Sequence, residues 1–291
     1  MRGLFIYGGV SPVFPMSVTH VVISKSVTTV KPRSFEHCQF LVSLIMHDEV
    51  ESIESYAFID CPRLEYVRVS KKLRYLGKYA FNCCSGLQYL FLPKTLTTVG
   101  RKVFWFCESL EFLVLPEEAD IREHTSEDFD ETGIFLNIAR PMGIDYTYCR
   151  VRPFNRQFAR NEWVPDGETP SNRRSSRSLN RWFLTYMNEY PLHKMCTDPS
   201  VSGNEISEYL SSEDASDATV IDRFHGMTAL HILAMNPHTP PGPVAALFHF
   251  NKEAIFILDR HSKTPIDLAR KFNVENMLGL INCLCILRER G

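Results

Sequence analysis

A 23-residue period between Val18 and Pro116 is the feature that most constrains how this chain can fold. Four successive segments align without a gap: VTHVVISKSVTTVKPRSFEHCQF, LVSLIMHDEVESIESYAFIDCPR, LEYVRVSKKLRYLGKYAFNCCSG and LQYLFLPKTLTTVGRKVFWFCES. The alignment places one phenylalanine and one cysteine of each segment in fixed columns: Phe35, Phe58, Phe81 and Phe104, and Cys38, Cys61, Cys84 and Cys107. Apolar residues in strict register at such a period are typical of a solenoid, in which each unit buries its apolar face against its neighbours.

Each unit divides into three parts, of which the first is a short strand. The opening L-x-x-L-x-L of a unit places Leu64, Val67 and Val69 toward one side, and the last two alternate with their neighbours as in a strand. A second apolar pair follows, and the segment around Phe81 is expected to form a short helical turn whose ring closes the end of the core. Residues 1–17 are interpreted as an N-terminal cap with a strand at residues 4–7, and the same frame predicts a degenerate sixth strand at 133–138.

The repeat pattern resembles the BspA-type leucine-rich-repeat family, whose unit has the form L-x-x-L-x-L-P-x-x-L-x-x-I-G-x-x-A-F-x-x-C-x-x. The resemblance covers residues 18–116 and includes Pro93 and Pro116. It implies a leucine-rich-repeat solenoid of short parallel strands and short helical turns over residues 18–140, with a degenerate C-terminal cap. It also implies a binding function, and surface adhesion is a role known for some members.

Residues 141–177 change in composition, and we interpret them as a linker. Eight arginines and no lysine occur between residues 141 and 181, with proline, asparagine and serine between them. The simpler interpretation is a solvated linker that the acidic run at 117–131 partly neutralises. The alternative is a nucleic-acid, nuclear-import or kinase-recognised segment, because RRSS is basophilic in appearance.

Residues 178–291 contain a second, longer repeat. The segments PLHKMC, GMTALHILAM and KTPIDLARKF align at intervals of 38 and 36 residues. They resemble ankyrin repeats, whose hallmark is T-P-L-H-x-A, although Ala229 replaces the proline and Asp267 replaces the last histidine. The matching positions are Asp222, Gly226, Thr228, Leu230, His231 and Ala234, and then Asp259, Thr264, Pro265, Leu268 and Ala269. This implies an α-helical ankyrin-like array in which threonine caps each helix and histidine links neighbouring turns. The order of the two repeat types is similar to a protein family common in diatoms.

The outward-facing strand residues are the candidate binding surface, because the later repeats place aromatic side chains there. Side chains that alternate with the core positions point to solvent, and aromatic residues and arginine are favoured in binding hot spots. The candidate partner-binding residues are Tyr66, Arg68, Tyr89, Phe91, Phe112 and Val114. The alternative, which the sequence leaves open, is that another part of the chain covers them.

No pattern in the sequence indicates catalysis, a cofactor or a metal. Phosphate-binding glycine loops, G-x-S-x-G and H-E-x-x-H are absent. The cysteine column reads as packed, reduced thiols, and His193 and His231 are explained by the ankyrin motif. We therefore expect no enzyme, and we assign no catalytic, cofactor-binding or metal-binding residue.

The function expected from the sequence is that of a non-catalytic protein–protein interaction scaffold with an unidentified protein partner. A net charge of −2 does not favour a nucleic acid or a membrane surface as partner. Neither a signal peptide nor a long apolar run is recognisable, so we expect the cytoplasm, with the nucleus possible. The alternative is a nuclear or nucleic-acid-associated regulatory protein that uses the arginine-rich segment, and a surface adhesin is the third hypothesis. The oligomeric state stays open.

Overall fold

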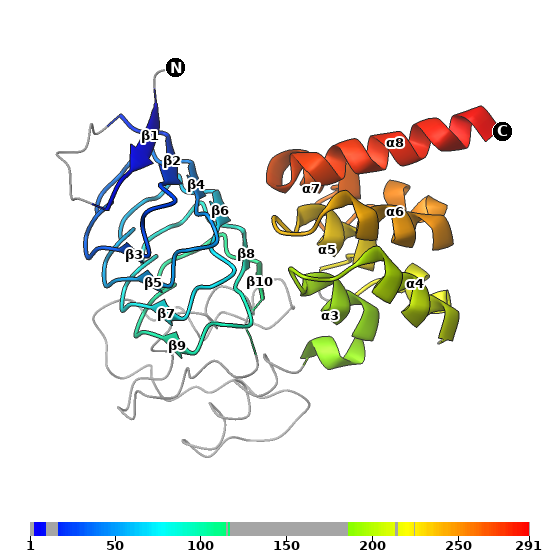
Figure 1. The fold of residues 1–291 in the computed structure, drawn as a ribbon, viewed down its shortest axis with the longest axis horizontal. Helices are drawn as coiled ribbons and strands as arrows, with labels where there is room; N and C mark the ends of the chain where they lie inside the picture. The colour runs from blue at the N-terminus through cyan, green and yellow to red at the C-terminus, as the bar shows by residue number, and fades with distance from the viewer. Residues whose placement is uncertain are drawn as a thin grey trace, which may run out of the picture. The chain divides into compact units, whose positions relative to one another are not determined.

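The computed structural model describes residues 3–9, 17–114, 116, 186–212, 215–223 and 225–290. The chain divides into two compact units, Met1–Thr185 and Tyr186–Gly291 (Figure 1). The expected strand at 133–138 and the expected linker at 141–177 lie outside the described residues, so both stay predictions. The described part of the second unit begins at Tyr186.

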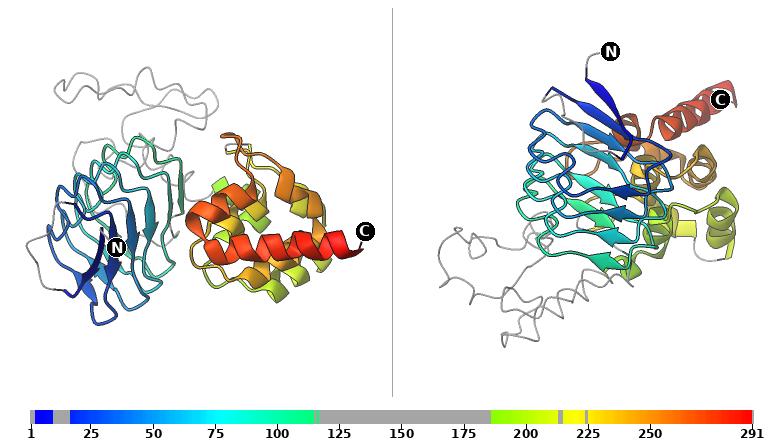
Figure 2. Two further views of the ribbon diagram at one scale, coloured as in Figure 1. Left: turned by 90° about the horizontal axis from the view of Figure 1, so that it is seen from above. Right: turned by 60° about the vertical axis from the view of Figure 1, so that its left-hand side comes forward.

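The first unit is a solenoid of short parallel strands (Figures 1 and 2). One wall contains a four-stranded sheet in the order β1-β2-β4-β6 and a two-stranded sheet of β8 and β10. The other wall is a four-stranded sheet in the order β3-β5-β7-β9. The strands of the first wall are β1 (Leu4–Tyr7), β2 (His20–Ile23), β4 (Ser43–Ile45), β6 (Tyr66–Arg68), β8 (Tyr89–Phe91) and β10 (Phe112–Val114). Those of the second are β3 (Thr29–Val30), β5 (Ser52–Ile53), β7 (Tyr75–Leu76) and β9 (Thr98–Val99).

The 23-residue period of the sequence is the pairing register of both walls. In the first wall His20 lies opposite Ser43, and Ser43 lies opposite Tyr66. In the second wall the pairs are Thr29–Ser52, Ser52–Tyr75 and Tyr75–Thr98. The predicted cap strand is confirmed, because β1 pairs in parallel with β2 and places Leu4 opposite His20. The expectation of parallel strands in a solenoid is therefore correct.

The core of the solenoid lies between the walls, and the inward positions are those predicted. Leu64, Val67 and Val69 are buried, as are all four phenylalanines of the column. The phenylalanine rings stack nearly parallel, with centroid separations of 4.8 Å, 5.3 Å and 6.1 Å from Phe35 to Phe104. Tyr7 continues the stack beyond Phe35 at 5.1 Å, in a tilted orientation.

The third side of each unit is formed by turns, so the expected short helical turn was wrong. Two residues per unit have positive φ, and they repeat every 23 residues: Arg33, Tyr56, Tyr79 and Lys102, and His37, Asp60, Cys83 and Phe106. Left-handed residues at this spacing prevent a continuous right-handed helix. Instead, backbone N–H groups donate to the next unit, as from Phe35 N to Ala57 O at 2.8 Å and from Phe58 N to Ala80 O at 2.8 Å. The turns thus form a third hydrogen-bonded side of the solenoid.

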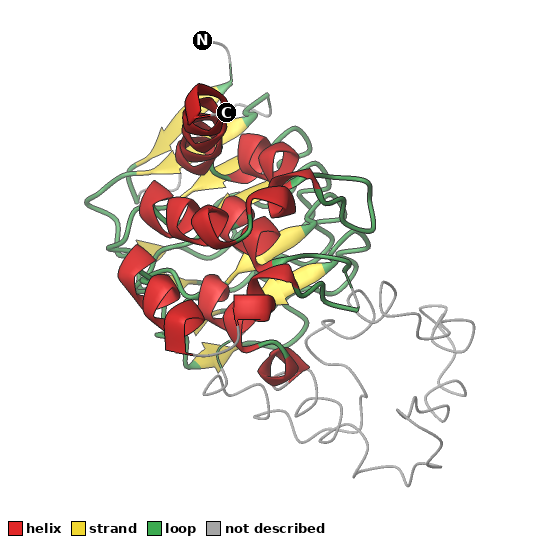
Figure 3. Cartoon of the chain, turned by 90° about the vertical axis from the view of Figure 1, so that its right-hand side faces the viewer, coloured by secondary structure: helices red, strands yellow, loops and turns green. Residues whose placement is uncertain are grey.

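The second unit consists of paired helices in two layers (Figures 1 and 3). Helix α5 packs against α3 and α7 in one layer, and α6 packs against α4 and α8 in the other. The α-helices are α3 (Pro191–Thr197), α4 (Gly203–Ser212), α5 (Ala229–Met235), α6 (Pro241–Phe250), α7 (Pro265–Phe272) and α8 (Val274–Arg290). The 3-10 helices are η4 (Tyr186–Glu189), η5 (Ala215–Thr219) and η6 (Lys252–Phe256). Among the described helices, none has the length and apolar character needed to cross a membrane.

Candidate interaction surfaces

Three aromatic side chains at the C-terminal end of the outward face of the first wall are buried, which is the alternative that the sequence left open. Tyr89, Phe91 and Phe112 are only 7%, 5% and 1% exposed. They do not belong to the apolar cluster inside the solenoid, so they point outward as predicted and are nevertheless buried. The rings of Phe91 and Phe112 pack on each other at 5.6 Å. Sequence alternation predicted the direction of these side chains correctly but not their accessibility.

The open part of this face lies at the N-terminal end of the stack. Leu4 and Ile6 of β1 are 49% and 64% exposed, and Ile45 of β4 is 37% exposed. The strand register places Ile6 opposite Val22 and Val22 opposite Ile45, so these three side chains form one row, which we call the open apolar row. The sequence did not reveal this row as a whole, because β1 is offset from β2 by an interval other than 23 residues.

Tyr66 and Arg68 border the open apolar row and are half-buried, as is Val114 farther along the face. The Arg68 guanidinium donates from Nη1 to the Met46 carbonyl, and its Nη2 lies 3.5 Å from Asp48 Oδ1. Burial raises the pKa of Tyr66, while the charge of Arg68 opposes that shift. Three of the six candidate residues therefore remain partly accessible, and Arg68 is held in place by the preceding unit.

The four aligned cysteines are structural. Each thiol of the later units donates to the carbonyl of the phenylalanine one unit earlier: Cys61 to Phe35 at 3.2 Å, Cys84 to Phe58 at 3.2 Å and Cys107 to Phe81 at 3.1 Å. Burial raises the pKa of Cys84 and Cys107, so both stay protonated. All four are buried and free of disulfides, which agrees with their interpretation as packed, reduced thiols.

Two histidines of the helical unit link successive repeats. His193 Nε2 lies 3.0 Å from the Met227 carbonyl, and His231 Nε2 lies 3.2 Å from the Lys263 carbonyl. His231 Nδ1 accepts from the Thr228 backbone N–H at 3.1 Å, so the proton of the neutral ring is on Nε2, which donates to Lys263. The predicted link between neighbouring turns is confirmed. These ring nitrogens are used within the fold, which gives them a structural role.

A second set of links was missed in the sequence. Asn236 Nδ2 donates to the carbonyls of Cys196 and Thr197 at 3.2 Å each. Asn273 Nδ2 repeats the arrangement, with donation to the carbonyls of Asn236 at 2.7 Å and Thr239 at 3.0 Å. The available signal was the interval between the two asparagines, which matches the repeat length. Histidines in the first turns of α3 and α5 and asparagines at the C-terminal ends of α5 and α7 therefore link the repeats.

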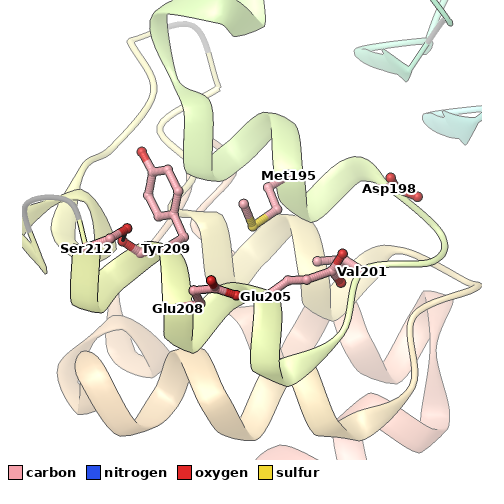
Figure 4. Close-up of a pocket in the computed structure, with 7 residues that line it drawn as sticks. All are labelled: Met195, Asp198, Val201, Glu205, Glu208, Tyr209 and Ser212. Atoms are coloured by element: carbon pink, nitrogen blue, oxygen red, sulfur yellow. Dashed lines mark hydrogen bonds between the residues drawn. The ribbon is translucent and has the colours of Figure 1, made fainter.

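An open groove of about 360 Å³ lies between α3 and α4 (Figure 4). It is lined by Met195, Asp198, Val201, Glu205, Glu208, Tyr209 and Ser212. Glu205 accepts from the backbone N–H and the hydroxyl of Ser202, each at 2.7 Å. Ser202 directly precedes α4, so Glu205 caps the N-terminus of its own helix, and part of the acidic lining is thus used within α4. Within the described residues, no group of three or more His, Cys, Asp or Glu side chains could hold a metal ion.

Comparison with known proteins identifies the repeat of the first unit. Residues 15–130 match the sequence model of the BspA type leucine rich repeat region in six copies. These residues are therefore BspA-type leucine-rich repeats. No curated protein matches the chain significantly.

Solved leucine-rich-repeat structures are similar to part of the chain. A leucine rich repeat protein of T. pallidum is 28% identical with a TM-score of 0.34, over 35% of this chain and 50% of that one. A leucine-rich repeat protein of Bacteroides ovatus is 29% identical with a TM-score of 0.33, over 36% and 27%. A leucine rich cell surface protein of Faecalibacterium prausnitzii is 28% identical with a TM-score of 0.35, over 36% and 28%. The chain thus spans half or less of the length of these structures.

Proposed function

We propose that this chain, whose residues 15–130 are BspA-type leucine-rich repeats, is a non-catalytic protein–protein interaction scaffold. The observation that carries the proposal is the open apolar row on the strand face, Ile6, Val22 and Ile45, with Ile6 64% exposed. Monomeric proteins seldom leave contiguous apolar side chains uncovered on a rigid sheet. Rigid strands also present such a row at low entropic cost to a partner.

The proposed contact surface keeps Tyr66 and Arg68 from the sequence-based candidates and shifts toward the N-terminal strands. Both side chains border the open apolar row and are partly accessible. Arg68 supplies a charged, hydrogen-bonding group that its contacts with Met46 and Asp48 pre-organise. Tyr89, Phe91 and Phe112 are buried and are not part of this proposed surface.

We further propose that the helical unit is an ankyrin-like array that serves as a second binding module. The Thr264 side chain accepts from the Asp267 backbone N–H at 3.2 Å, and Thr228 takes the equivalent capping position on α5. The two-layer stacking of the helices and the histidine links between repeats also support this proposal. Repeat arrays of this kind present an extended surface that suits protein partners.

A capture experiment with the intact chain tests the strand-face assignment. The double variant Ile45→Asp, Arg68→Glu places two carboxylates at the edge of the open apolar row, and we expect it to lose partners that the wild-type chain captures. The matched control is Tyr75→Ala in β7 of the other wall. It removes an aromatic side chain that is about as exposed as Ile45, at 36% against 37%. Equal loss in both variants, or loss in neither, would remove the strand face from the proposal.

We keep a cytoplasmic or nuclear location as part of the proposal. The free, buried cysteines of the described residues support it, because such thiols persist in reducing compartments. Fractionation of cells that express the tagged chain is the direct test. Recovery of the chain on the cell surface would favour the adhesin hypothesis instead.

A further inference from the structure

Strand β1 lies at the end of the first wall, and one of its edges, which we call the free edge, pairs with no strand among the described residues. It pairs with β2 on one side, and no other described strand pairs with it. In both Figures 1 and 2 it lies at the end of the stack, and the other strands of the first wall lie beyond β2. A terminal strand of this kind presents backbone N–H and C=O groups that another strand can bind.

The hydrogen bonds to β2 identify which residues of β1 face the free edge. The carbonyls of Gly3 and Tyr7 accept from the backbone N–H groups of His20 and Ser24, each at 2.8 Å. Successive residues of a strand direct their backbone groups to opposite sides. Gly3, Phe5 and Tyr7 therefore serve the ladder to β2, and Leu4 and Ile6 direct their N–H and C=O groups to the free edge.

The four described side chains of β1 include none of the residue types that commonly protect terminal strands. Natural proteins place lysine, proline or a bulge there to prevent pairing with other chains. The sequence of β1 is Leu-Phe-Ile-Tyr, with no charge and no proline. Leu4 and Ile6, which hold the free backbone groups, also have exposed side chains, at 49% and 64%.

We propose that β1 pairs antiparallel with β1 of a second copy of this chain. Leu4 and Ile6, whose backbone groups face the free edge, are two residues apart. An antiparallel copy centred on Phe5 therefore places Leu4 opposite Ile6 of the other copy, and Ile6 opposite Leu4. In this arrangement each opposed pair exchanges both of its backbone hydrogen bonds. The pairing is self-complementary, because the same two residues of each copy satisfy one another's N–H and C=O groups.

The pairing also covers the exposed side chains of β1. Directly opposed residues point to the same face of a sheet, so Ile6 meets Leu4 of the second copy on the outward face. The open apolar row of one copy then continues into that of the other. This inference goes beyond the proposed function, because it needs no other protein.

Sedimentation of the purified full-length chain over a wide concentration series tests the pairing. We expect a reversible monomer–dimer equilibrium. Ile6→Pro removes an N–H that faces the free edge and leaves the β1–β2 hydrogen bonds intact, since edge positions accept proline. It removes one donor from each copy, so we expect the dimer dissociation constant to rise about tenfold or more.

Two further variants complete the experiment. Ile6→Lys leaves the backbone unchanged and weakens the dimer by charge repulsion and lost apolar contact, which keeps the test valid if proline destabilises the fold. Ile45→Lys, on the same face and away from the edge, is the matched control and should leave the dissociation constant unchanged. A chain that stays monomeric at every concentration would overturn the proposal. So would a dimer that both Ile6 variants leave unaffected.

Discussion

Replacement of Phe81 by alanine tests the central packing element of the solenoid, the stacked phenylalanine column. The Phe81 side chain is fully buried. Its ring lies between those of Phe58 at 5.3 Å and Phe104 at 6.1 Å, both nearly parallel to it. The substitution therefore removes contacts with the preceding and the following unit at once. Because each unit contacts only its neighbours, no other part of the solenoid can compensate for them.

Two estimates of the magnitude agree. A buried phenylalanine removes about 150–250 Å² from water, which at about 25 cal/mol per Å² corresponds to about 4–6 kcal/mol for the whole side chain. Large-to-small substitutions in cores, where alanine keeps the Cβ and a cavity is left, cost about 3–5 kcal/mol for phenylalanine. We therefore expect Phe81→Ala to lower the free energy of unfolding of the solenoid by about 3–5 kcal/mol.

Guanidinium unfolding followed by tryptophan fluorescence measures this loss. The chain has three tryptophans, Trp105, Trp163 and Trp182, and replacement of the last two by phenylalanine leaves Trp105 as a reporter within the solenoid. The control is Phe40→Ala, since the Phe40 ring is 45% exposed and should cost less than about 1 kcal/mol. A loss below about 1 kcal/mol for Phe81→Ala, or equal losses for the two variants, would refute the assignment of this column to the core.

The remaining predictions concern pH and the close approach of neighbouring units. Burial lowers the pKa of His193 and His231 in the folded state, so the unfolded chain binds protons first as the pH falls below about 6.5. The stability that these neutral rings contribute is present above that pH and is lost as the pH falls below it. Thermal unfolding of the helical unit should therefore show a midpoint temperature that decreases as the pH is lowered through this range. Gly100→Ala should destabilise the solenoid, because the new Cβ would lie 2.4 Å from the Lys78 backbone nitrogen. Gly8→Ala, where a Cβ meets no atom within 4 Å, should leave the unfolding midpoint nearly unchanged.

The strand register and the core were predictable because one periodicity determines both. A 23-residue frame with alternating apolar residues places Phe35 beneath Phe58, and the same frame is the observed pairing of Ser43 with Tyr66. The capping roles of Thr228 and Thr264 were predictable for a similar reason, since a helix begins where a hydroxyl can accept its first free N–H groups. In each case a local pattern and the tertiary contact require the same residue type.

The conformation of the turns was not predictable from residue types. Left-handed backbone positions favour glycine or asparagine, whereas Arg33, Tyr56, Tyr79 and Lys102 hold one of them in this solenoid. The hydrogen bonds between units, such as Phe35 N to Ala57 O, act against that local preference. The tertiary ladder thus overrides the intrinsic backbone propensity of those side chains.

The accessibility of the strand face was not predictable either. Alternation predicts on which side of a strand a side chain lies, and it correctly placed Tyr89, Phe91 and Phe112 outside the solenoid interior. Whether an outward side chain meets water depends on the rest of the fold, and these three are buried. The open apolar row also escaped the sequence reasoning, because Ile6 belongs to a strand outside the 23-residue frame.

Both walls pair at the same interval of 23 residues, which limits how such a chain can change in evolution. Loss of residues 64–86 would bring Tyr89 opposite Ser43 and Thr98 opposite Ser52, with every strand still in register and the phenylalanine column unbroken. A duplication of one unit would be accommodated in the same way. A gain or loss of a single residue within a strand would instead turn the following side chains to the opposite face. The genetic step that this solenoid tolerates is therefore the whole 23-residue unit, so its length can vary between descendants while its cross-section is inherited unchanged.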